Sequence, residues 1–274
     1  MPFDYTTIGH VTADILADGT RRPGGSAFYS ALQASRLGRR SLIVTQGAAR
    51  EIEELLDPYR SEFELVILAA PETTTLETSV VGTERAQRVL AWAGPIAEDL
   101  AVDTAILHLA PVARETPRRF SGRADLVGLT PQGLVRAWEP DGGKVGHVAL
   151  EPAELPERWD AVVISEAERP SCEWLVSDPA GAVVVVTNAA APTAIHQRTT
   201  ATAWVHVPEI EDFRDDVGAG DVFAAAFFVA IAEGQPPADA ARFANAAAAV
   251  RISAVGADAI GHRPAIEARL RAVA

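Results

Sequence analysis

The chain has 274 residues, of which 48% are hydrophobic and 22% are charged, a composition typical of a soluble globular protein and not of a disordered one. A chain of this length can bury a substantial core as one domain, and no stretch resembles a linker between two domains. The formal net charge of −13 disfavours a general nucleic-acid-binding surface.

The first predicted element is a strand over Tyr5–Val11, whose β-branched residues favour a buried strand that delivers Asp14 into a loop. Gly24-Gly25 then opens a predicted helix that stops at Gly38, and another strand follows. This order of elements is typical of the start of a parallel α/β sheet. Without further context, the glycine pair is explained equally well by a plain turn.

Two extended segments in the next part of the chain, Thr73–Val81 and Arg88–Ala93, flank a Gly82-Thr83-Glu84 turn and predict a hairpin. Strands are also expected over Thr104–Leu109 and Leu126–Thr130. A helix that starts near Pro111 or Thr116 is expected to separate these two strands.

The loop after the second of these strands contains Gln132 and Arg136. Ligands of open α/β sheets bind where parallel strands end, so both residues are candidates for binding. Turn chemistry and a surface cation are the alternative explanation. A strand over Trp159–Ser165 is followed by Glu166 and Glu168, which spacing alone explains as acids at a helix N-terminus.

Valine-rich residues Ala182–Thr187 predict a central buried strand, and Thr199–Val207 predicts another. Ala238–Ser253, with Asn245 in its interior, predicts a long helix with an alanine-rich packing face. A terminal helix is expected to open at Pro264.

The segment DDVGAGDVFAAAFF, which runs from Asp215 to Phe228, predicts a glycine loop that leads into an apolar helix. The first amides of a helix have no intrahelical partners, so Gly218, Ala219 and Gly220 can form an anion site suited to a phosphate. Asp221 would lie beside that phosphate, where it can accept the proton of an attacking hydroxyl. Gly-x-Gly-Asp is also common at ordinary turn-to-helix junctions.

This segment resembles the C-terminal signature of the PfkB family of carbohydrate kinases, which have the ribokinase-like fold. The signature reads Asp-Thr-x-Gly-Ala-Gly-Asp, and Asp216 stands here in place of its threonine. The resemblance implies that Asp221 is the catalytic base. It also implies that the Gly-Ala-Gly amides stabilise the transferring phosphoryl group.

The N-terminal segment is similar to the sugar-binding signature of the same family. The resemblance implies that Asp14 binds acceptor hydroxyls and that the backbone of Gly24 and Gly25 lies against the sugar; Tyr29 replaces the usual asparagine and His10 stands where aspartate is common. The strands near 71–93 are similar to a small lid over the sugar site, although a solvated edge hairpin explains them equally well. The segment Pro131–Arg136, which contains Gln132 and Arg136, resembles a loop of inositol-kinase-like members.

The resemblance also implies a nucleotide and metal site. Glu168 would support magnesium, and Thr187 and Asn188 begin the nucleotide loop, in which the usual Thr-x-Gly-x-x-Gly glycines are absent. Missing glycines disfavour close approach of a nucleotide to the backbone. Asn245 lies on the helix similar to the adenine-side helix, and Val255-Gly256-Ala257 resembles a loop that contributes to a monovalent-cation site.

We therefore expect an α/β protein, a three-layer α/β/α ribokinase-like sandwich with a mostly parallel central sheet and a reduced β lid. A single domain would span residues 1–274, with lid segments near 10–25 and 71–93. The expected activity is ATP-dependent and Mg²⁺-dependent phosphorylation of a sugar, cyclitol or nucleoside hydroxyl, with a monovalent cation as an additional candidate. The alternative is a ribokinase-like binding or regulatory protein with weakened catalysis. A dinucleotide-dependent oxidoreductase is disfavoured because no Gly-x-Gly-x-x-Gly follows the first strand.

The remaining expectations concern location and partners. Cys172 is the only cysteine, which excludes an internal disulfide and a multi-cysteine zinc site. The N-terminus does not resemble a secretion signal, and the longest apolar run, Val222–Ala232, is too short to span a bilayer. We expect a cytoplasmic monomer or homodimer with a small-molecule partner and without nucleic-acid or membrane binding.

Overall fold

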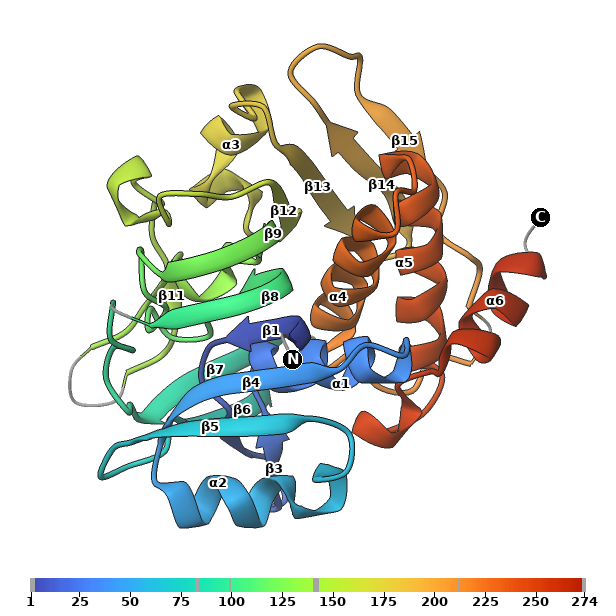
Figure 1. Ribbon diagram of the computed structural model, residues 1–274. Helices are drawn as coiled ribbons and strands as arrows, with labels where there is room; N and C mark the ends of the chain where they lie inside the picture. The colour runs from blue at the N-terminus through green and yellow to red at the C-terminus, as the bar shows by residue number, and fades with distance from the viewer. Residues whose placement is uncertain (1–2, 82–83, 99, 140–142, 211, 273–274) are drawn as a thin grey trace.

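The computed structural model describes residues 3–81, 84–98, 100–139, 143–210 and 212–272 as an α/β fold with a large, mostly parallel central sheet flanked by helices (Figure 1). The strands of this sheet are β1 (Phe3–Ile8), β4 (Ser41–Gly47), β5 (Glu64–Ala69), β8 (Ala101–Leu109), β9 (Ser121–Leu129), β12 (Ala161–Ser165), β13 (Val183–Asn188), β14 (Ala191–His196) and β15 (Ala203–Val205). Their order is β15-β14-β13-β12-β9-β8-β1-β4-β5. Neighbouring strands from β13 to β5 pair in parallel, whereas β14 and β15 are antiparallel.

A second sheet has four strands in the order β3-β2-β6-β7. They are β2 (Thr12–Ile15), β3 (Arg21–Gly24), β6 (Thr75–Val81) and β7 (Glu84–Ala91). We call this the lid sheet. It corrects the expected loop around Asp14, which lies on β2, and it contains the predicted hairpin as β6 and β7. Gly82 and Thr83 of the expected turn lie outside the described residues. The single-domain organisation stays a prediction.

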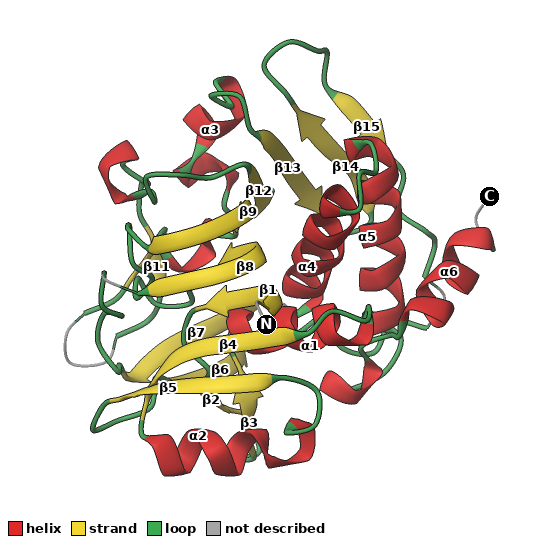
Figure 2. Cartoon of the chain, viewed as in Figure 1, coloured by secondary structure: helices red, strands yellow, loops and turns green. Residues whose placement is uncertain are grey.

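The two faces of the central sheet are covered differently (Figure 2). One face carries long helices, α1 (Ser26–Arg36), α4 (Ala219–Ala232), α5 (Pro237–Ile252) and α6 (Arg263–Arg271). Helix α2 (Ala49–Leu56) lies beside β4 and β5. The opposite face is covered mostly by irregular segments, together with α3 (Glu173–Ser177) and the short hairpin of β10 (Arg136–Ala137) and β11 (Gly146–His147). The 3-10 helices are η1 (Asp57–Tyr59), η2 (Pro131–Gly133), η3 (Pro152–Glu154), η4 (Arg169–Ser171) and η5 (Ala257–Ala259).

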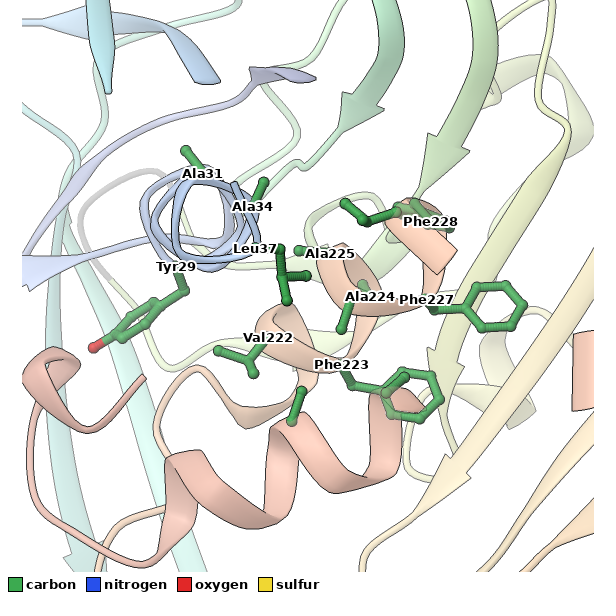
Figure 3. Close-up of a cluster of buried hydrophobic side chains, with 14 of the residues drawn as sticks. Tyr29, Ala31, Ala34, Leu37, Val222, Phe223, Ala224, Ala225, Phe227 and Phe228 are labelled. Carbon is green, nitrogen blue, oxygen red and sulfur yellow. The ribbon is translucent and has the colours of Figure 1, made fainter. Parts of the chain in front are cut away.

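Helix α4 is apolar on all sides because it is enclosed by the sheet and by helices α1 and α5. Figure 3 shows Ala224 and Ala225 of α4 on the side that faces Leu37 and Ala34, whereas Phe223 and Phe227 point away from α1. The ring of Phe228 reaches β9 at Gly128, where a Cβ atom would overlap it. This packing fixes where α4 begins, at the end of the sheet where the parallel strands finish. In the described part of the chain, no helix has the length and apolarity needed to cross a membrane.

Two expected elements differ from the structure. Residues 110–120 form no helix, because the buried carboxylate of Glu115 accepts hydrogen bonds from the backbone N–H groups of His10, Val112 and Ala113 and holds this segment as a loop. The expected strand Thr199–Val207 is only the short β15. The chain turns back directly after β13 and forms β14 first, so Pro192 lies near the start of a strand, where its missing N–H is tolerated.

Candidate active site

Two cavities lie side by side at the ends of the parallel strands, which is where open α/β sheets bind ligands. The smaller, of about 280 Å³, lies between the lid sheet, α1 and the start of α4. The larger, of about 560 Å³, is bordered by the ends of β12 and β13 and by α5. Four of the lining residues are common to both cavities: Gln132, Asp216, Gly220 and Asp221. Whatever occupies one cavity therefore meets the occupant of the other at this shared wall.

Asp221 lies in the first turn of α4, in the shared wall. Burial raises the pKa of its carboxyl group to about 6, and the negative charges of Glu168 and Asp14 act in the same direction. A hydrogen bond from Ser26 and the charge of Arg136 oppose this rise. At neutral pH the carboxylate is mostly ionised but takes up a proton readily, which is the property of a general base.

The first turn of α4 presents two unpaired backbone donors among the described residues, the N–H groups of Gly220 and Asp221. Gly218 is the N-cap of α4, with a left-handed φ of 77°, and the N–H of Ala219 donates to the carbonyl of Asp216. None of the described residues accepts a hydrogen bond from the N–H of Gly220 or Asp221. A Cβ atom on Gly220 would meet no protein atom within 4 Å, so this part of the helix end is open. Its geometry suits an anion.

Asp14 and Gly25 line the smaller cavity, whereas Gly24 lies behind Asp14. Asp14 lines the cavity, and its carboxylate accepts a hydrogen bond of 2.6 Å from the hydroxyl of Thr12. Gly25, with φ of 91°, lines it as well. Gly24 does not line it; a Cβ atom there would overlap the carboxylate of Asp14. The first glycine therefore makes room for the aspartate.

Tyr29, Gln132 and Arg136 all line the smaller cavity. Arg136 is not a surface cation. It is 9% exposed, and its guanidinium donates hydrogen bonds of 2.9 Å to the carbonyl of Val112 and to Oε1 of Gln87. Burial lowers its pKa, while nearby carboxylates, Glu168 first, partly offset that effect. The cavity thus combines hydrogen-bonding groups with one buried positive charge.

Glu168 and Thr187 line the larger cavity at the ends of two neighbouring strands. Glu168 is the N-cap of the short 3-10 helix η4, but its carboxylate makes no cap hydrogen bond; it accepts the N–H of Ser165 at 2.8 Å instead. No three His, Cys, Asp or Glu side chains of the described residues gather closely enough to hold a metal ion by themselves. Any ion at Glu168 would need oxygen atoms from a ligand or water.

Asn245 lines the larger cavity from α5 and is nearly buried. Its Oδ1 accepts the hydroxyl of Thr193 at 3.0 Å, and its Nδ2 donates to the carbonyl of His206 at 3.3 Å. Asn188, the other expected contact, is exposed and is not among the lining residues. The neighbouring Ala189 and Ala190 line the cavity instead, and Ala189 adopts the left-handed turn conformation, with φ of 45°. The missing glycines therefore do not close the cavity.

Several lining residues were not found from the sequence. Ser26 lines the smaller cavity, and apolar residues after β15, Val207, Ile210 and Phe213, form a wall of the larger one. The signal for this wall was three apolar side chains in an otherwise acidic loop. Phe213, which is 60% exposed, is the large aromatic side chain of this wall. Gln87, which also lines the smaller cavity, belongs to the hairpin that resembles inositol-kinase-like members and for which substrate contact was one of the two expected explanations.

Residues 169–262 match the model of the pfkB family carbohydrate kinases. This range contains α3, the glycine loop before α4, and helices α4 and α5. No curated protein sequence matches the chain.

Solved structures match over nearly the whole chain. They include a pyrophosphate-dependent kinase in the ribokinase family, complexed with a pyrophosphate analog and myo-inositol, at 23% identity and a TM-score of 0.75, with 96% of this chain and 99% of that chain covered. Arabidopsis thaliana ribokinase, complexed with ribose and ATP, matches at 18% identity and a TM-score of 0.74, with 99% of each chain covered. A nucleoside kinase of Methanocaldococcus jannaschii matches at 16% identity and a TM-score of 0.74, with 98% of each chain covered.

These similarities confirm the expected likeness to the PfkB family and to inositol kinases. The chain has the ribokinase fold, and its C-terminal third carries the pfkB carbohydrate kinase pattern. Inositol and nucleoside kinases share this fold with ribokinases.

Proposed function

We propose that the protein transfers the γ-phosphoryl group of ATP to a hydroxyl group of a sugar, cyclitol or nucleoside. One observation carries this proposal: the carboxylate of Asp221 lies in the wall shared by a polar cavity and a larger, more apolar one, beside unpaired backbone donors. The smaller cavity suits a hydroxylated acceptor, and the larger cavity suits a nucleoside. Phosphoryl transfer depends mostly on such positioning and on charge stabilisation.

The proposed step is a direct displacement. The acceptor oxygen forms a bond to the γ-phosphorus while its proton passes to Asp221, and the bond between that phosphorus and the oxygen of the leaving ADP breaks. The N–H groups of Gly220 and Asp221, which have no acceptor among the described residues, would stabilise the charge on the transferring group, and Gly218 and Ala219 would shape the turn that aims them. Asp14, the backbone of Gly25 and the side chains of Gln132 and Arg136 would orient the acceptor.

Magnesium is the proposed metal. The single buried carboxylate of Glu168 fits an ion that keeps several waters and takes its other oxygen ligands from phosphates. When bound, Mg²⁺ would neutralise charge on the donor phosphates. Glu168 would hold it directly or through water.

ATP is favoured as the donor over pyrophosphate. Pyrophosphate remains a candidate because pyrophosphate-dependent kinases are among the similar structures. The larger cavity, however, has a volume of about 560 Å³ and an apolar wall that ends at Asn245, and an inorganic anion would leave this wall without a partner. Thr187, Asn245 and Phe213 are therefore the proposed nucleoside contacts.

The deciding experiment measures phosphoryl transfer from ATP, and separately from pyrophosphate, to a panel of sugars, cyclitols and nucleosides in the presence of magnesium. ADP formation that requires an acceptor supports the proposal. Binding of an acceptor without turnover of either donor, and without nucleotide binding by calorimetry, would support the alternative of a binding or regulatory protein. The departures from the family pattern at His10, Tyr29, Ser165, Asp216 and residues 189–192 favour that alternative, and the retained Gly-Ala-Gly and Asp221 oppose it.

A further inference from the structure

Arg251, on α5, is a completely buried cation. Its Nη1 donates hydrogen bonds to the carbonyl oxygens of Asp215, at 3.3 Å, and Ala254, at 3.1 Å. Its Nη2 donates to the carbonyl of Val217, at 2.6 Å, and to the carboxylate of Asp215, at 3.0 Å. Three carbonyl oxygens and one carboxylate oxygen, from loops on both sides of α4 and α5, thus converge on one guanidinium.

These contacts fix the loop that precedes α4. Besides Arg251, the carboxylate of Asp215 accepts the N–H groups of Val217 and Gly256, each at 3.0 Å. Burial alone would raise the pKa of Asp215, but these hydrogen bonds, from Gly256 first, lower it, so the carboxylate stays ionised. The resulting ion pair joins residues 215–217 to residues 254–256. Gly218 and the open helix end follow immediately.

A monovalent cation was expected near the Val255-Gly256-Ala257 loop. The oxygen atoms that would bind such a cation there are the ones that accept hydrogen bonds from Arg251. Potassium and sodium bind carbonyl and carboxylate oxygens, which are the groups that surround the guanidinium. The carboxylate of Asp215 already faces the guanidinium of Arg251 and, at 3.8 Å, that of Arg22. A further cation placed among these oxygens would lie a few ångströms from buried positive charge, where charge repulsion is strong. The residues present therefore do not fit a monovalent cation at this position.

We propose that Arg251 takes the place of a monovalent cation in this protein. The guanidinium supplies the positive charge that holds the two loops together, so neither folding nor activity requires potassium. Arg251 is a positioning residue: it acts through Asp215 and Val217 on the amides and carboxylate at the start of α4. The activity part of this inference rests on the proposed kinase function, whereas the stability part does not.

The test compares thermal unfolding in potassium, sodium and choline chlorides at equal ionic strength. The unfolding temperature of the wild-type protein should be the same in all three salts. Arg251→Ala should unfold several degrees lower, and potassium or low concentrations of guanidinium should raise its unfolding temperature selectively. The control is Arg242→Ala, which removes an exposed arginine of the same helix and should change neither the temperature nor its salt dependence.

A second pair of variants separates charge from packing. Arg251→Lys and Arg251→Met have side chains of similar length, and only lysine keeps the positive charge. We expect the lysine variant to unfold at the higher temperature and to retain more activity, by about tenfold. Potassium should stimulate the alanine variant and leave the wild-type enzyme unchanged.

Two results would overturn the inference: selective stabilisation of the wild-type protein by potassium, or equal unfolding temperatures of the lysine and methionine variants. If Arg251→Ala does not fold, this matched pair and the wild-type salt series decide the question. A wild-type protein that lacks kinase activity but shows the expected unfolding pattern would contradict the proposed function and leave the role of Arg251 intact.

Discussion

The aromatic ring of Tyr29 fills the space in which a Cβ atom on Gly218 would lie. Gly218 is the left-handed N-cap of α4, and Tyr29 belongs to α1 and lines the smaller cavity. Tyr29, in the proposed acceptor pocket, therefore packs directly on the turn at Gly218, and this turn orients the backbone N–H groups at the start of α4. The absence of a side chain at position 218 is required both by the backbone conformation and by this contact.

Gly218→Ala should destabilise the protein by about 2–4 kcal/mol, because the substitution adds a left-handed backbone penalty to an overlap with the Tyr29 ring. Gly220→Ala is the matched control, since a Cβ atom there meets no protein atom within 4 Å. Denaturant unfolding measures both. Equal stabilities of the two variants would contradict the role assigned to the Tyr29 contact. The control should still impair turnover, because its methyl group projects into the open helix end.

Asp221→Asn should lower kcat by about 10²–10⁴-fold, because the variant cannot accept the acceptor proton. Its affinity for nucleotide and acceptor should change little, which calorimetry can measure. Asparagine keeps the size of the side chain, so a large loss of binding would indicate that Asp221 serves mainly to hold a ligand.

The same variant should be more stable than the wild-type protein in alkaline solution. The pKa of Asp221 is raised from 3.8 to about 6 in the folded protein. The stability that this shift contributes is therefore full below about pH 3.8 and is lost as the pH rises through 6. We expect Asp221→Asn to gain about 1–2 kcal/mol at pH 8, after discounting for the partial exposure of Asp221, to keep about half of that gain at pH 5, and to lose most of it near pH 4. Urea unfolding at these pH values checks this.

The pH dependence of kcat/KM should show an acidic limb with a midpoint near 6. Below that pH, Asp221 is protonated and cannot act as a base, so the rate should fall about tenfold per pH unit. A midpoint near the ordinary aspartate value of about 3.9 would mean that the reacting base is a different or a more exposed group.

Phe213→Ala should weaken nucleotide binding by about tenfold without lowering stability, since stacking on an exposed aromatic ring contributes about 1 kcal/mol or more. Trp204→Ala is a suitable control: Trp204 is 64% exposed, similar to Phe213 at 60%, but it does not line the larger cavity. Equal effects of the two substitutions on nucleotide affinity, measured by calorimetry, would remove Phe213 from the site.

Local signals predicted the parts of the site that depend on local geometry. The glycine loop and Asp221 lie within a few residues of one another, so a helix start with open amides follows from the sequence alone. The parallel sheet followed from the alternation of apolar strands with helices. Asp14 and Gly25 were expected to lie near Asp221, and all three line the smaller cavity; their chemical roles stay predictions.

The features that sequence reasoning missed depend on contacts between distant segments. Arg251 resembles any arginine near a helix end until the carbonyls of residues 215–217 are placed around it. The helix expected near Pro111 gives way to a loop because Glu115 satisfies its backbone donors from within the core. The tight turn before β14 was missed because a non-glycine residue, Ala189, adopts its left-handed conformation.

The wall common to the two cavities has a practical consequence for inhibitor design. A single compound that joins a polyol to a nucleoside through a short phosphate-like bridge would pass Gln132, Gly220 and Asp221 and occupy both compartments at once. Because the second half of such a compound binds at a high effective concentration once the first half is bound, its affinity would far exceed that of either half alone. A fragment that filled only one compartment would lack this advantage.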